Sequence, residues 1–438
     1  MTGPSLADGR SPAGKKRRSG GGGGGGGGER TASINSLDHD ILCMVFSLLG
    51  PFDLAYCSSV CKFWNNIVSK SKLLQDLYYR RRGSYAHSSD MPALSQKPLR
   101  YYMREWAIQH HQSSLREGDV QVDQWKGHSI GVNQCRMKMG LILTGVGDKV
   151  MRLWSAESFK CLGEYAIPHA VSLIDYEFDE SKIVGLIGTR IGIWRRGGQR
   201  SIFPSREGTF PKGLCLRYLD PEAVVGCEDG TVRVFDMYSR KCSRIIRMHS
   251  APVTCLSLSS EQLIFSGSSF GSITISGLSS DERVATLRPH DRIGIKTLCF
   301  NPGSNLVFAG CASGYASCWD LRKMGVLWER RVSPNVLYSL GHMQYDTSTL
   351  VVGGIDGVLR VLDQSTGELV SSYIMDQPVS SASSSGGIEK RKGRRLSEDA
   401  QIDSIPRAAR PQITCLAVGM KKVVTAHNEK QIRLWKFH

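Results

Sequence analysis

The chain has 438 residues, of which 41% are hydrophobic and 22% charged, and its formal net charge is +16 at pH 7. This length exceeds that of one small core, so two or more domains are expected. No segment approaches the roughly 20 apolar residues of a membrane helix, and the charged N-terminus lacks the apolar stretch of a secretory signal. The composition therefore predicts a soluble intracellular protein without membrane attachment.

The 13 cysteines do not follow a disulfide or zinc pattern. They are scattered through apolar, strand-like segments, and no two Cys-x-x-Cys pairs have finger spacing. Cys57 and Cys61 lie one helical turn apart, but no partner histidine or cysteine follows at the distance that a zinc finger needs. We expect reduced, buried thiols, no metal site and no cofactor.

The positive charge is concentrated in tails and connectors. Lysine and arginine exceed the acidic residues mainly within 1–32, 70–117 and 387–410, and the rest of the chain is nearly neutral. Residues 1–33 contain nine consecutive glycines after a basic cluster, and such a segment cannot bury enough apolar surface to fold. We predict a disordered N-terminal tail.

Residues 34–82 show the apolar periodicity of three short helices. Leu37, Ile41 and Val45 recur at helical spacing in the first, which Gly50-Pro51 ends. A second helix is expected from Asp53, and a third should carry Val60, Trp64 and Ile67. About 45 residues form too small a core, and the helices are apolar on more than one face, so another protein is expected to cover part of them.

These residues resemble the F-box, with matches at Leu37, Asp40-Ile41-Leu42, Val45-Phe46-Ser47, Leu49, Leu54, Val60-Cys61-Lys62 and Trp64. The family binds an Skp-type adaptor, which implies adaptor contacts from Leu37, Asp38, Ile41, Leu42, Val45, Phe46, Leu49, Leu54, Val60 and Trp64. Asp38 stands where the family has a proline that lies at the adaptor contact. An incidental helical bundle is the alternative interpretation.

Residues 83–118 form a predicted helical linker. The segment "LRYYMREWAIQHH" would place Tyr102, Trp106 and His110 on one face of a helix. Two interpretations remain open: a stiff spacer that fixes the distance between two modules, or a helix packed under the following domain.

From residue 119 onward the chain repeats. Apolar strands end at equivalent positions, 40 to 43 residues apart and once 73 apart: Trp154, Trp194, Phe235, Ser276, Trp319, Leu362 and Trp435. The long step matches a polar, basic insertion at about 379–410, which we predict to be disordered. Seven repeats with one insertion are therefore expected.

The repeats resemble WD repeats, most fully in Gly127-His128, Thr144-Gly145, Asp148 and Trp154 of the first unit. In that family the His, Thr, Asp and Trp side chains form a hydrogen-bonded chain that locks each blade. Further histidines at 169, 249 and 290 fit the pattern, units three, six and seven lack the histidine, and unit four has Ser276 in place of tryptophan. The implied fold is mainly β: a seven-bladed propeller over residues 119–438, preceded by the small α-helical domain.

The last repeat contains only three strands before the chain ends. The alternating segment "DVQVDQW", Asp119 to Trp125, precedes the first repeat and can supply the fourth. We predict that Val120 and Val122 belong to a strand that pairs with Ile432 to Trp435 and closes the ring.

No convincing catalytic constellation is present, and Walker and HExxH patterns are missing from the sequence. An F-box followed by a propeller resembles the substrate receptors of SCF-type (Skp–cullin–F-box) ubiquitin ligases, which tether a target without catalysis. The expected partners are an Skp-type adaptor, a cullin and an unknown protein target.

Two other functions fit parts of the sequence. The tetrapeptide Trp319-Asp320-Leu321-Arg322 resembles the box by which WD-repeat receptors engage the damage-binding-type adaptor of another cullin class. The basic clusters Lys15–Arg18 and Lys390–Arg395 suit nuclear import, which favours a nucleus-and-cytoplasm location and permits a nuclear scaffold. Nucleic-acid binding is disfavoured because these clusters lack interleaved aromatic residues.

Relatives with a phosphopeptide target hold it with arginines near the start of each unit's first strand. The corresponding residues here are Asn133, Thr254, Lys296 and Thr414, and the turn residues Lys149 and Arg190 open on the same face. Because one of the four is basic, an unmodified protein surface is favoured as the target. Ser397 in "RRLS" fits the preference of basophilic kinases and is a candidate phosphorylation site.

Overall fold

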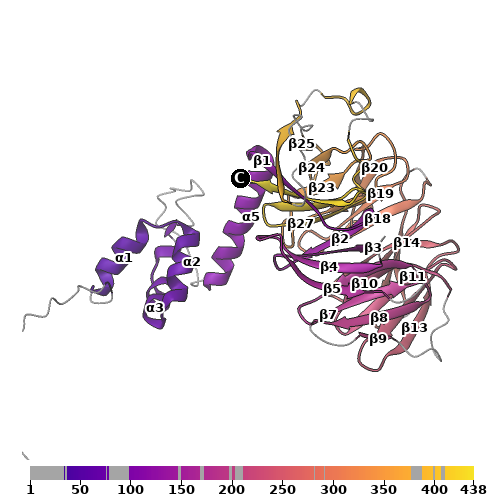
Figure 1. Cartoon of the computed structure of the whole chain (residues 1–438), viewed down its shortest axis with the longest axis horizontal. Coiled ribbons are helices and arrows are strands. Elements are labelled where there is room, and N and C mark those ends of the chain that lie inside the picture. Colours follow the sequence, from indigo (N-terminus) through magenta and orange to yellow (C-terminus); the bar gives the residue numbers. More distant parts are fainter. Residues whose placement is uncertain are drawn as a thin grey trace, which may run out of the picture. The chain divides into compact units, whose positions relative to one another are not determined.

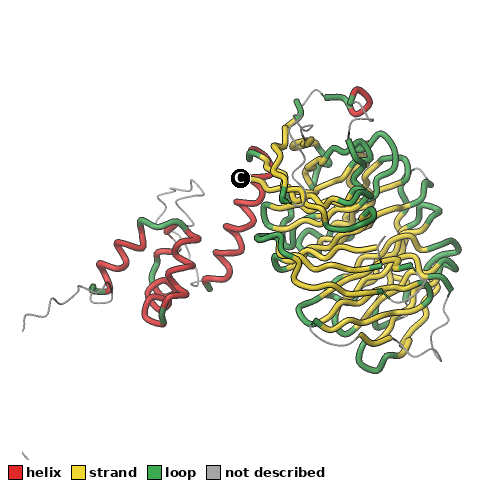
Figure 2. Tube along the Cα trace, viewed as in Figure 1, coloured by secondary structure: helices red, strands yellow, loops and turns green. Residues whose placement is uncertain are grey.

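The computed structural model describes residues 34, 37–74, 76–77, 98–146, 149–167, 172–196, 200–202, 211–280, 282–290, 292–375, 387–397, 400–405 and 410–438. The chain divides into two compact units, Met1–Met103 and Arg104–His438. Helices dominate the first and strands the second (Figure 2). The predicted N-terminal tail and the first part of the linker, residues 83–97, lie outside the described residues.

The first unit contains three helices: α1 (His39–Ser47), α2 (Pro51–Val60) and α3 (Lys62–Lys70). Gly50 caps α2 and Pro51 is its first residue, where a missing N–H costs nothing, so the predicted break separates α1 from α2. Val60 ends α2 instead of belonging to the third helix as predicted. The sulfur of Cys61 caps α3 by accepting a hydrogen bond from the Trp64 backbone N–H at 3.4 Å.

The helices pack around a small apolar core. Its buried members come from all three helices: Leu42, Phe46, Leu54, Ile67 and Val68. The Phe46 and Trp64 rings meet edge to face with their centroids 5.2 Å apart, a geometry that aromatic pairs favour.

The second unit is a β-propeller whose described strands form seven blades, as predicted (Figure 1). Blades one to three contain β2 (Val132–Lys138), β3 (Leu141–Val146), β4 (Val150–Ser155), β5 (Cys161–Ala166); β6 (Leu173–Phe178), β7 (Lys182–Ile187), β8 (Arg190–Arg195), β9 (Arg200–Ile202); β10 (Gly213–Leu219), β11 (Glu222–Cys227), β12 (Thr231–Asp236) and β13 (Lys241–Arg247). Blades four and five contain β14 (Val253–Leu258), β15 (Leu263–Ser268), β16 (Ile273–Gly277), β17 (Arg283–Leu287); β18 (Ile295–Asn301), β19 (Leu306–Cys311), β20 (Tyr315–Asp320) and β21 (Gly325–Arg331). Blades six and seven contain β22 (Ser339–Gly341), β23 (Thr349–Gly353), β24 (Leu359–Asp363), β25 (Leu369–Met375); β27 (Cys415–Gly419), β28 (Lys422–Ala426), β29 (Gln431–Phe437) and β1 (Val120–Lys126).

The ring closes through β1, as predicted. This strand pairs antiparallel with β29, and the register places Val122 opposite Trp435 and Trp125 opposite Ile432. In Figure 1 the purple β1 runs beside the yellow strands from the end of the chain. The edge of β29 is thus covered, which removes the unpaired edge that the sequence left open.

The basic insertion contributes a strand, so the prediction that it is wholly disordered is wrong. β26 (Glu389–Arg395) pairs with β25 of blade six and with β1 of blade seven, which joins the two blades into one nine-stranded sheet. Gly393 lies opposite Val120, and a Cβ at this glycine would come within 2.7 Å of the Val120 side chain. Main-chain pairing on both edges supports a strand whose own side chains are almost all charged.

Helix α5 (Leu99–Glu117) crosses the boundary between the units, and its part from Arg104 onward packs on the propeller. The Leu115 carbonyl accepts hydrogen bonds from Ser371 Oγ at 2.7 Å and Tyr373 OH at 2.8 Å. His111 Nδ1 accepts from the Lys421 N–H at 3.0 Å. His111 is buried, and the exposed His110 places its Nε2 3.2 Å from Lys421 Nζ. For this part of α5 the packed-helix interpretation holds, not the free spacer.

Candidate functional site

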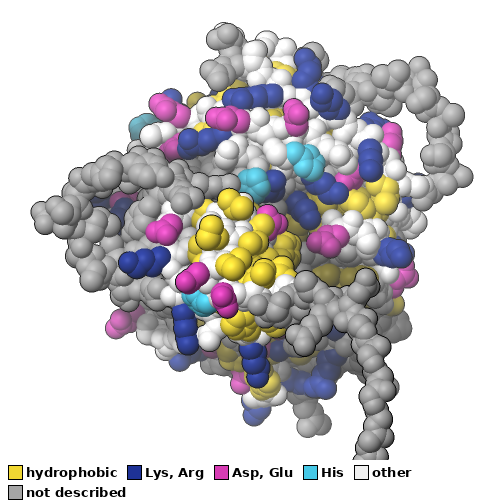
Figure 3. All heavy atoms as spheres, turned by 90° about the vertical axis from the view of Figure 1, so that its left-hand side faces the viewer, with side chains coloured by type: hydrophobic (Ala, Val, Ile, Leu, Met, Phe, Trp, Pro, Cys, Tyr) yellow, Lys and Arg dark blue, Asp and Glu magenta, His cyan; other side chains and the backbone are white. Residues whose placement is uncertain are grey.

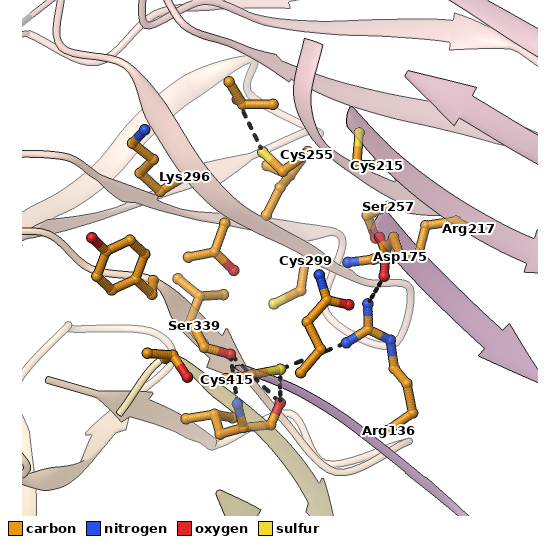
Figure 4. A pocket seen from close by; sticks show the side chains of 18 of the residues that line it. Arg136, Asp175, Cys215, Arg217, Cys255, Ser257, Lys296, Cys299, Ser339 and Cys415 are labelled. Carbon is orange, nitrogen blue, oxygen red and sulfur yellow. Dashed lines mark hydrogen bonds and ion pairs between the residues drawn. The ribbon is translucent and has the colours of Figure 1, made fainter. Parts of the chain in front are cut away.

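The first strands of all seven blades surround a cavity of about 740 Å³ (Figure 4). Four of the six residues predicted to bind a target line it: Asn133, Thr254, Lys296 and Thr414. Lys149 and Arg190 are exposed at the starts of β4 and β8 and are not among the lining residues. Because β3 runs antiparallel to β2, the end of β3, which precedes Lys149 in the chain, lies beside the start of β2.

Two of these side chains tie blades together. Thr254 Oγ1 lies 2.5 Å from the Ile295 carbonyl of the next blade and 3.1 Å from the Gly267 carbonyl. Thr414 Oγ1 lies 3.1 Å from the Ala426 carbonyl and 3.3 Å from that of Asn133 in blade one. Since each hydroxyl hydrogen is used within the propeller, the exposed Asn133 and Lys296 are better placed to bind a target.

A charged cluster that was not predicted from the sequence also lines the cavity. Arg136 Nη2 contacts Asp175 Oδ1 at 2.7 Å, and Arg217 Nη1 contacts Asp175 Oδ2 at 3.1 Å. These groups come from blades one, two and three. Arg136 lies three residues beyond Asn133, one of the first-strand positions considered for target binding, and that spacing was the available signal.

Glu177 extends this cluster. Burial alone would raise the pKa of its carboxyl, but Lys138, 2.9 Å away, and then Arg136 hold that pKa below its usual range. The carboxylate is therefore ionised and balances part of the positive charge. The cavity wall consequently presents paired charges instead of a bare cationic surface.

The predicted hydrogen-bonded lock is present in blade one. Thr144 Oγ1 lies 2.8 Å from His128 Nε2 and accepts from Trp154 Nε1 at 2.8 Å. Arg152 Nη1 donates to His128 Nδ1 at 2.9 Å, which makes Nδ1 the acceptor and leaves Nε2 as the N–H that donates to Thr144. Asp148 and His169 lie outside the described residues, and His290 is exposed.

Blade seven has a lock whose histidine comes from a different place in the repeat. Thr425 Oγ1 lies 2.7 Å from His427 Nε2 and accepts from Trp435 Nε1 at 2.9 Å. The unit lacks a histidine at the position where other units have one, as expected from the sequence, and His427, two residues after Thr425, takes part in the lock instead. The shared ten-residue spacing from threonine to tryptophan in both blades was the signal that could have found it.

Buried histidines predict that stability falls in mild acid. Burial lowers the pKa of His249 in blade four from 6.5 to about 4, and that of His427 well below 6.5. Below pH 6.5 these histidines are protonated in the unfolded chain but stay neutral in the folded chain. The stability that they give the folded state above pH 6.5 is therefore lost progressively toward pH 4. We expect His249 alone to account for roughly 3 kcal/mol over this window.

Urea unfolding at pH 7.5, 6.0 and 5.0 measures this effect. His249→Asn should reduce the slope of unfolding free energy against pH, because the buried ring nitrogen that resists protonation is removed. Equal slopes in the wild type and His249→Asn would contradict the role of buried neutral histidine.

The first unit presents a large apolar surface. Leu48 is 86% exposed and Met44 71% exposed, and further exposed apolar side chains belong to this unit: Ile41, Val45, Tyr56, Val60 and Phe63. Figure 3 shows hydrophobic side chains gathered at the centre of the face that it views. An exposed cluster of this kind usually marks a surface that binds another protein.

The residues predicted to contact the adaptor differ in their exposure to solvent. Asp38, Ile41, Val45 and Val60 are exposed, while Leu37, Leu49 and Trp64 are half-buried. Leu42, Phe46 and Leu54 are buried in the helical core of the free chain. Met44, Leu48, Tyr56 and Phe63 are exposed but were not among the predicted contacts, because helical spacing alone does not say which of two apolar faces is covered.

The tetrapeptide that suggested a second adaptor ends β20. Trp319 and Asp320 are buried, and both Asp320 oxygens accept from the Arg322 guanidinium at 2.9 Å. Arg322 is thus folded back on its own turn.

Comparisons with known proteins agree with this two-part structure. The F-box domain family matches residues 34–76, and the WD domain, G-beta repeat family matches residues 281–320. An F-box/WD-40 repeat-containing protein of Arabidopsis thaliana is 54% identical over 434 residues, which cover 93% of this chain and 95% of the relative. The chain belongs to the F-box/WD-40 repeat proteins.

More distant similarities concern the propeller. The angio-associated migratory cell protein of Homo sapiens is 22% identical over 257 residues, 53% of this F-box/WD-40 chain and 57% of that protein. The crystal structure of the computationally designed Ika8 protein has a TM-score of 0.51 at 16% identity and covers 72% of this chain and 98% of that one. At this identity the likeness supports the fold alone.

Family membership sets the coarse function. An F-box implies binding to an Skp-type adaptor in general, WD repeats imply protein partners, and members of this family are typically non-catalytic receptors or adaptors. Within the described ranges, no three His, Cys, Asp or Glu side chains are grouped so that they could hold a metal ion. No helix in the part of the chain that the structure describes is both long and apolar enough to cross a membrane.

Proposed function

We propose that this chain is the substrate receptor of an SCF-type cullin–RING ubiquitin ligase. Its F-box docks on the Skp-type adaptor, and the propeller holds a target protein. The observation that carries the proposal is the apolar surface of the helical domain, where Leu48 and Met44 are largely exposed to solvent and are not part of the domain's own core. A bound adaptor would remove these side chains from water.

The chemistry follows from tethering. The receptor raises the effective concentration of the target's lysines near a ubiquitin-loaded enzyme, so no side chain of this chain takes part in bond formation. A rigid propeller suits this role because its ring is closed at β1 and β29.

The cavity favours an unmodified protein surface over a phosphopeptide as the target. The guanidinium groups of Arg136 and Arg217 already bind Asp175, and Lys138 binds Glu177. A phosphate would have to displace these buried carboxylates from their partners, at a large electrostatic cost. The exposed Lys296 and Asn133 at the mouth are the residues we assign to target contact.

We also place the protein in the nucleus and cytoplasm. The basic cluster Lys15–Arg18 lies outside the described residues, and the second cluster forms β26, on which Lys390, Lys392 and Arg394 are exposed. Ser397 is exposed two residues after β26 ends and remains a candidate phosphorylation site. Fluorescence localisation of the wild type and of Ser397→Ala tests both assignments.

Adaptor binding is tested with surface variants. Met44→Asp combined with Leu48→Asp should weaken binding to a purified Skp-type adaptor by roughly a hundredfold or more, because charges would enter an apolar interface. Leu162→Asp, at an exposed leucine of the propeller, is the matched control and should leave binding unchanged. Calorimetry measures affinity, and circular dichroism checks folding.

Three outcomes would contradict the proposal. The wild type does not bind the Skp-type adaptor, the double variant binds as well as the control, or the chain co-purifies instead with the damage-binding-type adaptor. The last result would support the Trp319–Arg322 interpretation. Leu42→Asp is unsuitable as a surface test because this side chain is buried and the domain would unfold.

A further inference from the structure

Two cysteines meet where the ring closes. Cys135 belongs to the first strand of blade one, and Cys415 begins the first strand of blade seven. The Cys415 S–H donates to the Cys135 carbonyl oxygen at 3.4 Å, and the strands β2 and β27 that carry the two cysteines lie side by side. Cys415 lines the central cavity, whereas Cys135 lies fully buried behind it.

A fixed guanidinium approaches the Cys415 sulfur. Arg136 Nη1 lies 3.6 Å from that sulfur and donates to the Cys135 carbonyl at 3.0 Å, while Nη2 is held by Asp175 at 2.7 Å. Figure 4 shows the guanidinium between Asp175 and Cys415. The positive group therefore cannot swing away from the sulfur without breaking a buried ion pair.

This environment separates Cys415 from the other thiols of the cavity. The hydrogen bond from Cys135, and then the Arg136 charge, lower the pKa of the Cys415 thiol to about 6. Burial instead raises the pKa of Cys215, Cys255 and Cys299, which line the same cavity. These three are internal controls, because they share the cavity but not the arginine contact.

We propose that Cys415 is a nucleophilic thiolate that small peroxides reach through the cavity, and that Cys135 is the resolving thiol with which it forms a reversible disulfide. A thiolate beside a cation, with a second cysteine on the neighbouring strand, is the arrangement that redox-sensitive cysteines use. The inference is independent of the ligase proposal.

The reaction balances with hydrogen peroxide as the oxidant. The Cys415 thiolate attacks one peroxide oxygen, the O–O bond breaks, and hydroxide leaves, so the sulfur is oxidised to a sulfenic acid. The Cys135 sulfur then attacks the Cys415 sulfur, the S–O bond breaks, and the oxygen leaves as water with the Cys135 proton. A low-molecular-weight dithiol reverses the step by thiol–disulfide exchange.

The disulfide would join blade one covalently to blade seven. Because it cross-links residues far apart in sequence, it restricts the unfolded chain strongly. We expect the oxidised protein to melt roughly 5 °C higher than the reduced protein, with the gain lost in Cys415→Ser. Cys255→Ser should keep the gain.

The decisive test uses the full-length reduced protein. It is treated with hydrogen peroxide, quenched with iodoacetamide, digested without reductant and analysed by mass spectrometry. The expected result is a peptide pair linked through Cys135 and Cys415, absent in Cys415→Ser and retained in Cys255→Ser. In Cys135→Ser, dimedone should trap the Cys415 sulfenic acid, since no resolving thiol is left.

A second readout needs no variant. The iodoacetamide rate at each cysteine of the native protein is followed from pH 5 to 9 by peptide mass spectrometry. Cys415 should be alkylated at least tenfold faster than Cys255 and Cys299 at pH 7, with a half-maximal rate near pH 6. Equal rates at the three cavity cysteines, or peroxide-induced links that do not involve Cys415, would overturn the proposal.

Discussion

Val122→Asp should lower the free energy of unfolding of the propeller by about 4 kcal/mol or more. Val122 is 0% exposed and packs in the apolar cluster between blades six and seven, which includes Tyr373 and Trp435. An aspartate there would bury a carboxylate without a partner and weaken β1, which pairs with both β29 and β26. Urea unfolding followed by tryptophan fluorescence measures the loss.

The matched control is Val326→Asp, a valine that also lies in the outermost strand of its blade but is 52% exposed. It should change the free energy of unfolding by less than about 1 kcal/mol, because the new carboxylate stays in water. If the two variants were equally stable, β1 would not be required for ring closure, and the propeller would owe its stability to the individual blades.

Ring closure was predictable because it follows from counting strands. The last repeat has three strands, an open edge is unfavourable, and Asp119–Trp125 was the remaining alternating segment. The strand β26 was not predictable in the same way. Its sequence, "EKRKGRR", has no apolar alternation, and its conformation depends on two edges, β25 and β1, that become neighbours only after the ring has closed.

Part of the candidate site was predictable, because the repeat fixes where some of its residues lie. Asn133 and Lys296 were placed at the cavity mouth from their position within a repeat, which the repeat itself fixes. The charged cluster depends on which side chains of blades one, two and three face one another, and that follows from the curvature of the ring. No spacing within one repeat pairs Arg136 with Asp175.

In the helical domain, the sequence did not show which apolar side chains are buried and which are exposed. Helical spacing identified an apolar face in α1, but Leu42 and Phe46 face the core while Met44 and Leu48 face solvent. Both groups recur at intervals of four residues. The direction in which α2 and α3 pack decides between them, and this depends on the break at Gly50-Pro51 and on the sulfur cap at Cys61.

Asp175→Asn should destabilise the propeller by about 3 to 5 kcal/mol, the usual cost of breaking a buried ion pair from one side. The Asp175 side chain is 5% exposed, and its two oxygens accept from Arg136, Arg217 and the Leu216 N–H. Asparagine removes the negative charge that both guanidinium groups contact and turns an NH₂ group toward one of these donors, which then loses its acceptor.

The control for this prediction is Asp403→Asn, which also removes a carboxylate that binds an arginine. The Asp403 side chain is 60% exposed and contacts Arg331 at 2.8 Å, so its loss should cost less than about 1 kcal/mol. Urea unfolding of both variants at low and high salt measures the contrast. Because salt screens exposed charges far more than buried ones, only the Asp403 effect should shrink at high salt. A small cost for Asp175→Asn would show that the arginines are satisfied by water in the cavity, and would reopen them as ligands for an anionic target.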